Sequence, residues 1–504
     1  MDAKQLKDDV RAGRIGLDRL VDLIEGMQRQ LRESQRQLDE ANRRIAELEK
    51  NPGPQAINKV EGAFSVEAEE KRQEARGKVK RKRKRPTRRG RVTTAEKVRS
   101  AERSEKCYPA DVAESECWFS HTRPVWRLED GRAVLVAYEI YRAPNGAYGK
   151  ICGVLGRSEF GLEIVIAISF QVHVLGLSFD KVCLLMGFFQ KLNLKKSQVD
   201  ALLTQLARHW EGEFERLCTL LANSAVVHAD ETSWSLNSVW ALLSEKARVI
   251  LFGVHKDAAT LEQILDPTKF TGILISDDAA VYANFTAAQK CWAHLLRKAI
   301  KLTLIAPDNT EYRESADGLL AIYREACRVQ RDGRLSDAGR AKKVAALDDR
   351  ILELCGPMWC AELPPLEGPD DDYRLLCNEM MRLMLAKELF TFVTSPPVTT
   401  PTGEAVPVAG TNNEAERTLR NPATARDTGR TNKTLVGARR RTIHASVLES
   451  LRCYLPVFTL SSVITEVQHW LDTGHSCFAR MLKELGLSLA DRSVLKALYS
   501  APDG

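Results

Sequence analysis

The chain has 504 residues, of which 44% are apolar and 28% are charged. This length predicts several domains with a sizeable core, and the composition is that of an ordinary globular protein. No apolar run is long enough to cross a bilayer, and the first twenty residues lack the pattern of a signal peptide. The 12 cysteines are scattered along a long chain, which argues against disulfides. We therefore expect a cytoplasmic protein that does not enter a membrane.

The positive net charge of +7 comes from one segment. Residues 76–91 hold eleven Lys and Arg and no acid, and without these residues the +7 would become −4. The densest part of this basic arm is Lys80, Arg81, Lys82, Arg83, Lys84 and Arg85. Such a run binds polyanions through phosphate contacts and counterion release, so we expect it to contact nucleic acid. The alternative is a solvated tail without a partner.

Residues 1–50 carry a heptad repeat that predicts a coiled coil. Its two seam positions are filled by Leu17, Ile24, Leu31, Leu38 and Ile45, and by Leu20, Met27, Ser34, Ala41 and Leu48. We expect it to join copies of the chain into a homo-oligomer; a helix packed on its own protein is the alternative. Residues 51–106 are polar and poor in aromatics, which predicts a disordered linker that contains the basic arm. A basic-leucine-zipper is excluded, because its basic helix would precede the zipper.

Residues 107–157 predict a small β-rich module. Strands are expected at 133–141 and 147–155, around the turn formed by residues 144–146. Cys107, Cys117, His121 and Cys152 are spaced too loosely for a typical zinc site, so we interpret the cysteines as free thiols and expect no zinc.

Residues 158–221 are expected to be helical. One amphipathic piece covers residues 179–189, and Ser197 is expected to cap a second piece that runs to Trp210. Two helices across a short turn resemble a helix-turn-helix that contacts DNA, although any helical hairpin gives this pattern.

Two apolar runs end in acids. The run from Val226 leads to Asp230, and the run from Ile273 leads to Asp277 and Asp278. Strand-end carboxylates commonly hold divalent metal; the alternative for Asp230 is the N-cap of a helix. Between the two runs, residues 238–255 predict a hairpin and residues 257–265 a short helix. This order of elements is the one expected of a ribonuclease-H-like core: a strand, a hairpin, a helix and a strand, with acids on the first and last strands.

A third acid, Glu416, lies at the start of a predicted helix with Asn413 as its expected N-cap. Glu416 could then simply complete a capping box. Against this, basic residues surround the helix and suit a site that holds a phosphodiester: Arg417, Arg420, Arg426, Arg430, Lys433, Arg439, Arg440 and Arg441. Glu414 should face elsewhere. Residues 301–393 are expected to be largely helical, with a turn at Gly356-Pro357 between Cys355 and Cys360, and residues 395–408 to form a loop.

These stretches together resemble DDE transposases of the insertion-sequence 66 type. The matching motifs are Asp230-Glu231-Thr232 before Trp234 and Trp240, Asp277 five residues before Tyr282, Cys291-Trp292-Ala293-His294 with Arg297, and Asn412-Asn413-x-x-Glu416-Arg417-x-x-Arg420. The resemblance covers most of the chain. Three departures are Asp278 in place of a glycine, Thr411 in place of an aspartate, and a cysteine element reduced to Cys107 and Cys117.

The resemblance implies an α/β ribonuclease-H-like catalytic core formed by residues 222–300 and 405–460. A helical insertion would occupy residues 301–404 and a helical tail residues 461–504. An N-terminal coiled coil and a mostly helical DNA-binding region would precede the core.

The resemblance also implies a nucleoid-associated transposase that cuts and joins DNA with Mg²⁺, which Mn²⁺ can replace. Asp230, Asp277 and Glu416 would hold the metal, with Asp277 preferred to Asp278 because of its spacing to Tyr282. The residues expected to contact DNA are those of the basic arm together with His294, Arg297, Arg417, Arg420, Arg430 and Lys433. For His294, the alternative is a structural role. The partners would be double-stranded element ends and target DNA, a second copy of the chain, and companion proteins of the element. A non-catalytic regulator of the element and a nuclease without strand transfer are the alternative functions.

Overall fold

The computed structural model describes residues 32, 36, 92–360, 367–489 and 492–499. Arg32 and Arg36 are helical and exposed. Otherwise the heptads and the basic arm Lys80–Arg85 lie outside the described residues, so the coiled coil and the DNA contact of the arm stay predictions.

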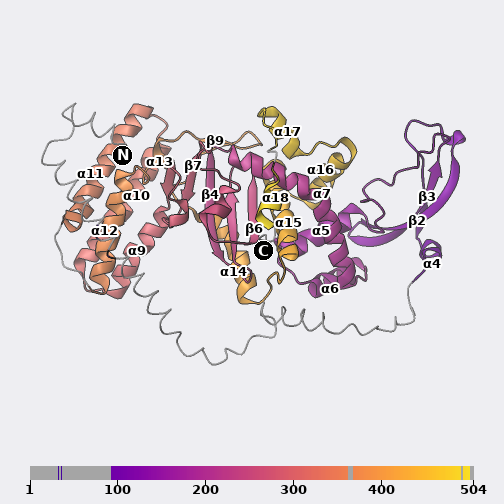
Figure 1. Cartoon of the computed structure of the whole chain (residues 1–504), viewed down its shortest axis with the longest axis horizontal. Coiled ribbons are helices and arrows are strands. Elements are labelled where there is room, and N and C mark those ends of the chain that lie inside the picture. The colour runs from indigo at the N-terminus through magenta and orange to yellow at the C-terminus, as the bar shows by residue number, and fades with distance from the viewer. Residues whose placement is uncertain (1–31, 33–35, 37–91, 361–366, 490–491, 500–504) are drawn as a thin grey trace, which may run out of the picture.

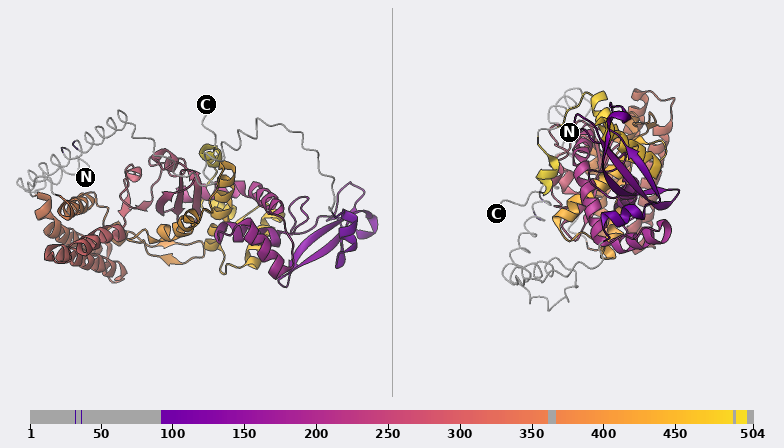
Figure 2. Two further views of the ribbon diagram at one scale, coloured as in Figure 1. Left: turned by 90° about the horizontal axis from the view of Figure 1, so that it is seen from below. Right: turned by 90° about the vertical axis from the view of Figure 1, so that its right-hand side faces the viewer.

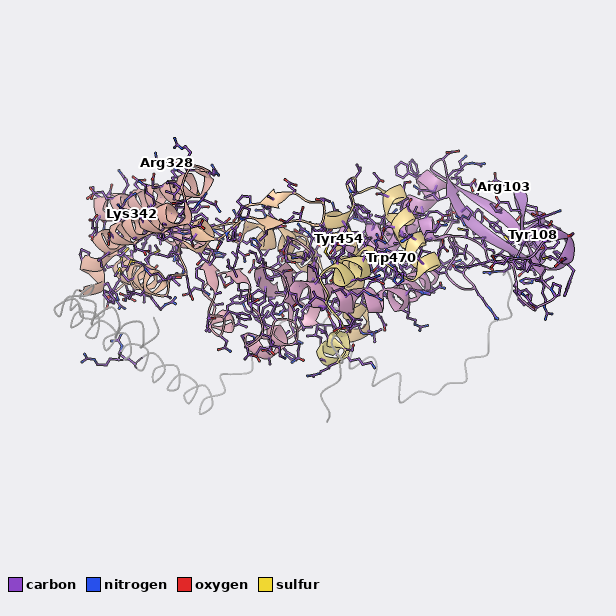
Figure 3. All side chains as sticks on the ribbon, turned by 90° about the horizontal axis from the view of Figure 1, so that it is seen from above. Arg103, Tyr108, Arg328, Lys342, Tyr454 and Trp470 are labelled. Carbon is purple, nitrogen blue, oxygen red and sulfur yellow. The ribbon has the colours of Figure 1, made fainter. Side chains whose placement is uncertain are left out.

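Three parts follow one another along the longest axis of the molecule (Figure 1). A small sheet lies at one end, a larger sheet with its covering helices lies in the middle, and a helical part lies at the other end, as the view from below also shows (Figure 2). Arg103 and Tyr108 mark the first end and Arg328 and Lys342 the other (Figure 3). None of the described helices is both long and apolar enough to cross a membrane.

The small sheet has the order β1-β3-β2, and β2 and β3 form a long hairpin. It is built from helix α4 (Thr94–Arg99), β1 (Arg103–Cys107), the 3₁₀ turn η1 (Glu114–Glu116), β2 (Trp118–Glu129) and β3 (Arg132–Arg142). The expected disordered linker is wrong for residues 92–106, because Thr93 and Glu96 cap α4 reciprocally and β1 pairs with β3. The expected strand at 147–155 is also wrong: this segment makes only isolated bridges, and β3 pairs instead with the preceding strand.

The next segment is helical, as predicted. It contains α5 (Leu162–Ser169), the π-helical turn η2 (Phe170–Val174), α6 (Phe179–Gln190) and α7 (Lys196–Ala222). The N-cap of α7 is Lys195 and not Ser197, and the helix runs twelve residues beyond Trp210. Its apolar face, including Leu203 and Trp210, is buried in the same hydrophobic cluster as the larger sheet. The predicted boundary at residue 221 therefore does not separate two cores, and the DNA contact of this region stays a prediction.

The larger sheet has five strands in the order β6-β5-β4-β7-β8. Strand β5 is antiparallel to β4 and β6, whereas β7 is parallel to β4 and β8. Its elements are β4 (Val226–Ser233), β5 (Ser238–Leu243), β6 (Arg248–Val254), α8 (Ala258–Glu262), β7 (Ile273–Ser276), the turn η3 (Ala280–Tyr282) and β8 (Ala288–Lys290). The predicted order of strand, hairpin, helix and strand is present.

Helices cover both faces of this sheet. Because side chains alternate along a strand, Val227 and Ala229 pack toward α7, whereas their neighbours point to the other face. On that other face α14 (Asn413–Asp427) packs on β4 and β5 through Ala415 and Leu419. The C-terminal elements that complete the covering are α15 (Leu435–Tyr454), α16 (Leu460–Thr473), α17 (Cys477–Glu484) and α18 (Val494–Tyr499).

Helix α15 also closes the edge of the sheet at β6. The backbone N–H groups of Arg248, Ile250 and Phe252 donate to the hydroxyls of Ser450, Ser446 and Thr442, each at 2.9 Å. These hydroxyl residues are spaced by four, so they lie on one face of α15 and match alternate residues of the strand. The unpaired edge of β6 is therefore covered by side-chain hydrogen bonds.

The helical part between β8 and α14 has its own hydrophobic cluster, which reaches the larger sheet at Val226 and Ile275. It comprises α9 (Trp292–Ile305), α10 (Thr310–Arg331), α11 (Asp337–Cys360), α12 (Pro369–Leu385) and α13 (Thr391–Thr394). The expected turn at Gly356-Pro357 is wrong, because both residues lie inside α11. The expected loop at 395–408 carries a small hairpin, β9 (Val398–Thr399) with β10 (Ala405–Val406).

Candidate functional site

Strand geometry brings Asp230 and Asp277 to neighbouring positions. In the parallel pair β4–β7, Val226 lies opposite Ile273 and His228 opposite Ile275. The same register continued by two residues sets Asp230 opposite Asp277, which directly follows β7. Because side chains alternate, Asp230 shares its face of the sheet with His228, on the side covered by α14. Asp277 therefore directly follows the carboxyl end of β7, whereas Asp230 lies inside β4, just past the part that pairs with β7. The N-cap alternative for Asp230 is wrong, since Asp230 lies within β4.

Asn412 ties the start of α14 to β4. Its buried side-chain amide donates to the Ala229 carbonyl at 2.7 Å, and its Oδ1 lies 3.2 Å from Nδ1 of His228. Its backbone N–H donates to the Cys291 sulfur at 3.0 Å. Asn412, not Asn413, is the N-cap of the helix, which leaves Ala415 at the position where a capping box needs Glu. The capping-box alternative for Glu416 is therefore wrong, and Glu416 lies one helical turn after an anchored residue.

The side chain of Glu416 points to helix α9. Its carboxylate forms an ion pair with Arg297, and its Oε1 lies 3.5 Å from Nδ1 of His294. The ligand atoms of Cys291, His294 and Glu416 all lie within 4.8 Å of one another, so these three residues could hold a metal ion. Sequence reasoning had placed Cys291 in a motif without a role; its sulfur now links α9 to the start of α14.

The electrostatics also bring the three predicted acids together. The pKa of Asp230 is raised to about 7, mostly by burial and also by the charges of Glu231, Asp277 and Glu416, against a hydrogen bond from the Glu231 N–H. The pKa of His294 is lowered by its burial and by Arg297, against the charges of Glu416 and Asp277. Asp277 and Glu416 thus lie near enough to Asp230 to raise its pKa, and we call these three residues the acidic site.

Asp277 and Asp278 differ in their surroundings. Asp278 forms an ion pair with Arg382 of α12 and lies 4.0 Å from the ammonium group of Lys290. Asp277 accepts a hydrogen bond at 3.1 Å from the Ala279 N–H and raises the pKa of Asp230. Asp277 therefore faces the acidic site, whereas Asp278 is occupied by cations of the helical part.

Glu231 is a buried acid of a different kind. Its carboxylate accepts a hydrogen bond from the Tyr282 hydroxyl and forms an ion pair with Lys256 at 2.9 Å. The Asp277-to-Tyr282 spacing therefore has a structural basis, because it brings Tyr282 to Glu231 of the first strand. Sequence reasoning missed this pair; the strand alternation that separates Glu231 from Asp230 was the available signal.

The predicted basic field around α14 divides into two groups. Arg417 and Arg420 are exposed on the helix that carries Glu416. Three other arginines make structural contacts: Arg426 donates to Ser233 Oγ at 2.6 Å, Arg439 pairs with Glu211 at 2.9 Å, and Arg440 pairs with Asp200 at 2.6 Å. The side chains of this second group are therefore largely occupied by contacts within the protein.

The remaining basic residues lie after α14. Arg430 is exposed and donates to Thr428 Oγ1 at 2.9 Å, whereas Lys433 is half-buried. Arg441 is buried, with its guanidinium group 4.4 Å from the centre of the Phe252 ring. Arg417, Arg420 and Arg430 are therefore the exposed arginines nearest to Glu416 in sequence.

The comparisons with known proteins agree with the motifs. The family model described as "Transposase IS66 family" matches residues 157–440, which is more than half of the chain. No curated protein matches the chain. The matched region includes the acids at 230, 277 and 416 together with the helical part between them. The chain therefore belongs to the transposase IS66 family.

Proposed function

We propose that this protein is a DNA transposase that binds the ends of a mobile element and catalyses metal-dependent strand cleavage and strand transfer. One observation carries the proposal: three acids from separate segments lie close together, since the register of β4 and β7 sets Asp230 opposite Asp277, and Asp277 and Glu416 both raise the pKa of Asp230. The order of the elements and the mixed five-stranded sheet support a ribonuclease-H-like core for residues 222–300 and 405–460.

The donor set suits Mg²⁺ or Mn²⁺. Hard divalent cations prefer carboxylate oxygens, and neither Asp230 nor Asp277 forms an ion pair with any residue that the structure describes. The raised pKa of Asp230 fits a group whose negative charge lacks a cation. Asp230, Asp277 and Glu416 would hold the metal. When bound there, it would activate the attacking oxygen and stabilise the leaving oxygen in an in-line displacement at phosphorus.

The residues around the acids would position DNA. Glu416 would exchange Arg297 for the metal, which leaves the Arg297 guanidinium group to contact a phosphate. His294, whose lowered pKa favours the neutral form, would lie beside the scissile phosphate. Arg417, Arg420, Arg430 and Lys433 would hold the DNA backbone, and the basic arm would add affinity without sequence preference.

Two successive displacements would follow. In the first, a water oxygen attacks phosphorus at the end of the element, and the 3′ oxygen leaves. In the second, the freed 3′-hydroxyl attacks a phosphodiester of the target, the 3′ oxygen of the target strand leaves, and the element is joined to the target. A homo-oligomer built through residues 1–50 would bring two ends together, and companion proteins of the element could take part.

The test is cleavage of labelled element-end DNA with Mg²⁺ or Mn²⁺, comparing the wild type with Asp230→Asn, Asp277→Asn and Glu416→Gln. We expect each change to abolish cleavage and joining and to leave end binding intact. Asp278→Asn is the matched control and should keep most of the activity.

Three outcomes would contradict parts of the proposal. Binding without cleavage under every metal condition, also with companion proteins, would indicate a regulator. Released ends without joined product would indicate a nuclease. Loss of binding in a folded Asp230→Asn protein would make Asp230 a structural residue.

A further inference from the structure

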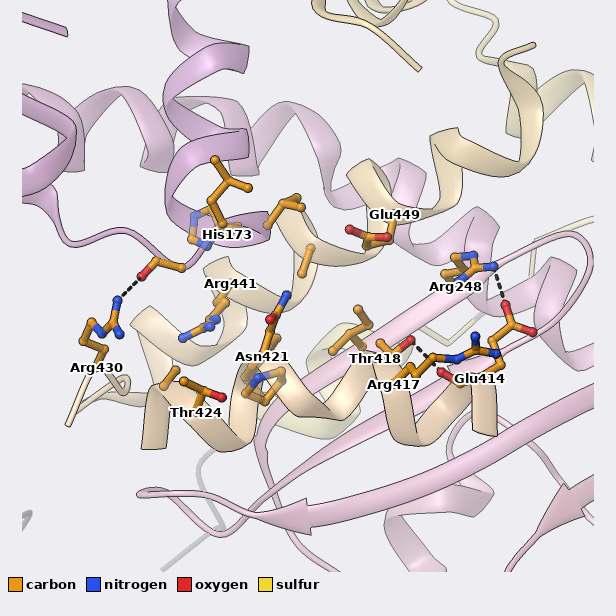
Figure 4. Close-up of a pocket in the computed structure, with 18 residues that line it drawn as sticks. His173, Arg248, Glu414, Arg417, Thr418, Asn421, Thr424, Arg430, Arg441 and Glu449 are labelled. Atoms are coloured by element: carbon orange, nitrogen blue, oxygen red, sulfur yellow. Dashed lines mark hydrogen bonds and ion pairs between the residues drawn. The ribbon is translucent and has the colours of Figure 1, made fainter. Parts of the chain in front are cut away.

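A second polar site lies on the other side of α14 from Glu416. It is a cavity of about 510 Å³ between the π-helical turn η2, strand β6 and helices α14 and α15 (Figure 4). This volume falls within the range of small-molecule pockets. Helix α14 lines it with Glu414, Arg417, Thr418 and Asn421, which recur at helical spacing on one face.

Positive charge dominates the cavity. Arg417 and Arg430 are exposed at its rim, and Arg441 lies at its buried floor (Figure 4). The cavity also contains two acids, but each already has a cationic partner. Glu414 pairs with Arg248, and Glu449 pairs with Arg452 at 3.0 Å. The charges of the three arginines at 417, 430 and 441 are thus left without a carboxylate partner among the described residues.

The floor holds polar groups that lack partners. Arg441 and His173 are each only 8% exposed. Nε of Arg441 and both ring nitrogens of His173 make no hydrogen bond with any described residue. Aromatic contacts hold both side chains in place: the guanidinium group lies over Phe252, and the His173 ring stacks on His444 with centroids 4.5 Å apart. Burying unpaired polar groups costs free energy, and a ligand that accepts hydrogen bonds would satisfy Nε of Arg441 and the protonated ring nitrogen of His173.

We propose that this cavity binds a phosphate ester, held by Arg417 and Arg430 at the rim and by Arg441 at the floor. Guanidinium groups recognise phosphate oxygens by paired, charge-assisted hydrogen bonds. His173, Thr418 and Asn421 add hydrogen-bonding groups for the rest of the ligand.

The source of the phosphate is a nucleotide of the DNA strand that passes the acids. Glu416 and Arg417 are consecutive residues of α14, so the cavity and the acidic site flank one helix of roughly 10–12 Å diameter. This assignment to DNA rests on the proposed transposase function; the phosphate site itself does not.

The phosphate site is tested by calorimetric titration of the full, metal-free chain with inorganic phosphate and with deoxynucleoside monophosphates. We expect binding that weakens at least tenfold in Arg441→Met and in the double variant Arg417→Ala with Arg430→Ala. Arg439→Gln, on the same helix but paired with Glu211 outside the cavity, should bind like the wild type. Asp230→Asn should also bind normally, which separates this site from the acids.

Two results of this titration would contradict the phosphate site. If no phosphate compound binds, or if Arg441→Met binds as tightly as the wild type, the site is overturned. Melting temperatures show whether each variant is folded, and the rim double variant keeps the test valid if Arg441→Met does not fold. Because this assay measures binding without cleavage, it can succeed even if the proposed catalysis fails.

The assignment of the phosphate to DNA is tested by measuring the affinity of the protein for a short single-stranded oligonucleotide at several salt concentrations. We expect Arg441→Met to weaken binding and to reduce the slope of log K against log salt by about 0.7, the value for one phosphate contact on a single strand. If nucleoside monophosphates bind through Arg441 but the oligonucleotide affinity does not change, the ligand is a free nucleotide and the DNA assignment is overturned.

Discussion

Adjacent carboxylates of β4 have different environments because a strand alternates its faces. Asp230 points toward α14 without an ion pair among the described residues, whereas Glu231 points away, pairs with Lys256 and accepts a hydrogen bond from Tyr282. The buried negative charge of Glu231 has a fixed partner, and the charge of Asp230 does not. This difference identifies Asp230 as the residue that is available for a ligand, and it makes a prediction about stability.

Asp230→Asn should stabilise the metal-free protein at alkaline pH. The pKa of Asp230 is about 7 in the folded state against 3.8 ordinarily, so between about pH 4 and 7 the folded state keeps a proton that the unfolded state has lost. The free energy of unfolding therefore falls as pH rises through this window, by roughly 2–4 kcal/mol in total. Asparagine removes this loss, so the melting temperature in EDTA should exceed that of the wild type at pH 8 and match it near pH 4.

Asp278→Asn is the control, since Asp278 already has Arg382 as its partner and should gain nothing at pH 8. A melting temperature of Asp230→Asn at or below that of the wild type at pH 8 would show that Asp230 bears no electrostatic strain.

Arg297 should compete with metal for Glu416. The Arg297 side chain is 55% exposed, so its ion pair with Glu416 is worth only about 0.2–1 kcal/mol. Arg297→Ala should therefore raise the Mn²⁺ affinity of the DNA-free protein by a factor of about 1.4 to 5, as measured by electron paramagnetic resonance. Lys298→Ala, which removes a neighbouring cation that pairs with Glu379, is the matched control. An unchanged or weaker affinity in Arg297→Ala would mean that Glu416 does not bind the cation.

At the scale of elements, helix α15 stabilises the sheet through its hydroxyl row. In Ser446→Ala the buried N–H of Ile250 loses its acceptor at 2.9 Å, which should cost about 1–3 kcal/mol in the free energy of unfolding. Urea denaturation measures this loss. Ser461→Ala, at an exposed position of α16, should change stability by less than about 0.5 kcal/mol. Equal effects of the two substitutions would show that another group satisfies the edge of β6.

Elements defined by local patterns could be predicted, and elements defined by distant partners could not. The apolar runs that lead into Asp230 and Asp277, and those within residues 238–255, were sufficient to predict β4, the hairpin β5–β6 and β7. The cap of α14 was misplaced by one residue, because Asn412 is fixed by Ala229 and His228 of a strand far away in sequence. Strand β2 was missed for a different reason: its residues Trp118 to His121 are exposed and show no apolar alternation.

The same distinction applies to the site. The three acids could be predicted because apolar runs lead into Asp230 and Asp277 and the motifs of the resembled family include all three. The cavity with Arg441 and His173 could not, because η2, β6, α14 and α15 meet only in the folded chain. Arg441 resembled one more surface cation in a basic run, and only its burial against Phe252 distinguishes it.

At the scale of the whole molecule, the acidic site lies where the two large hydrophobic clusters meet. One cluster joins α7 and α15 to the sheet, and the other joins the helical part to Val226 and Ile275. Glu416 forms an ion pair with Arg297 of α9, and Asp278, which follows Asp277, forms one with Arg382 of α12. Movement of the helical part relative to the sheet would therefore alter the acidic site. If the proposed function holds, the helical part is positioned to couple the proposed DNA binding to the geometry of the acids.

The oligomer should depend on residues 1–50. A heptad seam associates by burying leucines that would otherwise contact water, so lysines at two seam positions should separate the chains. We expect Leu31→Lys with Leu38→Lys to reduce the molar mass measured by light scattering to that of one chain, and to abolish joining of paired ends while single-end binding remains. Arg29→Ala with Arg43→Ala, on the outer face of the same heptads, should leave the mass unchanged. If the lysine variant keeps its mass but melts at a lower temperature, the helix packs on its own protein and the contact between chains lies elsewhere.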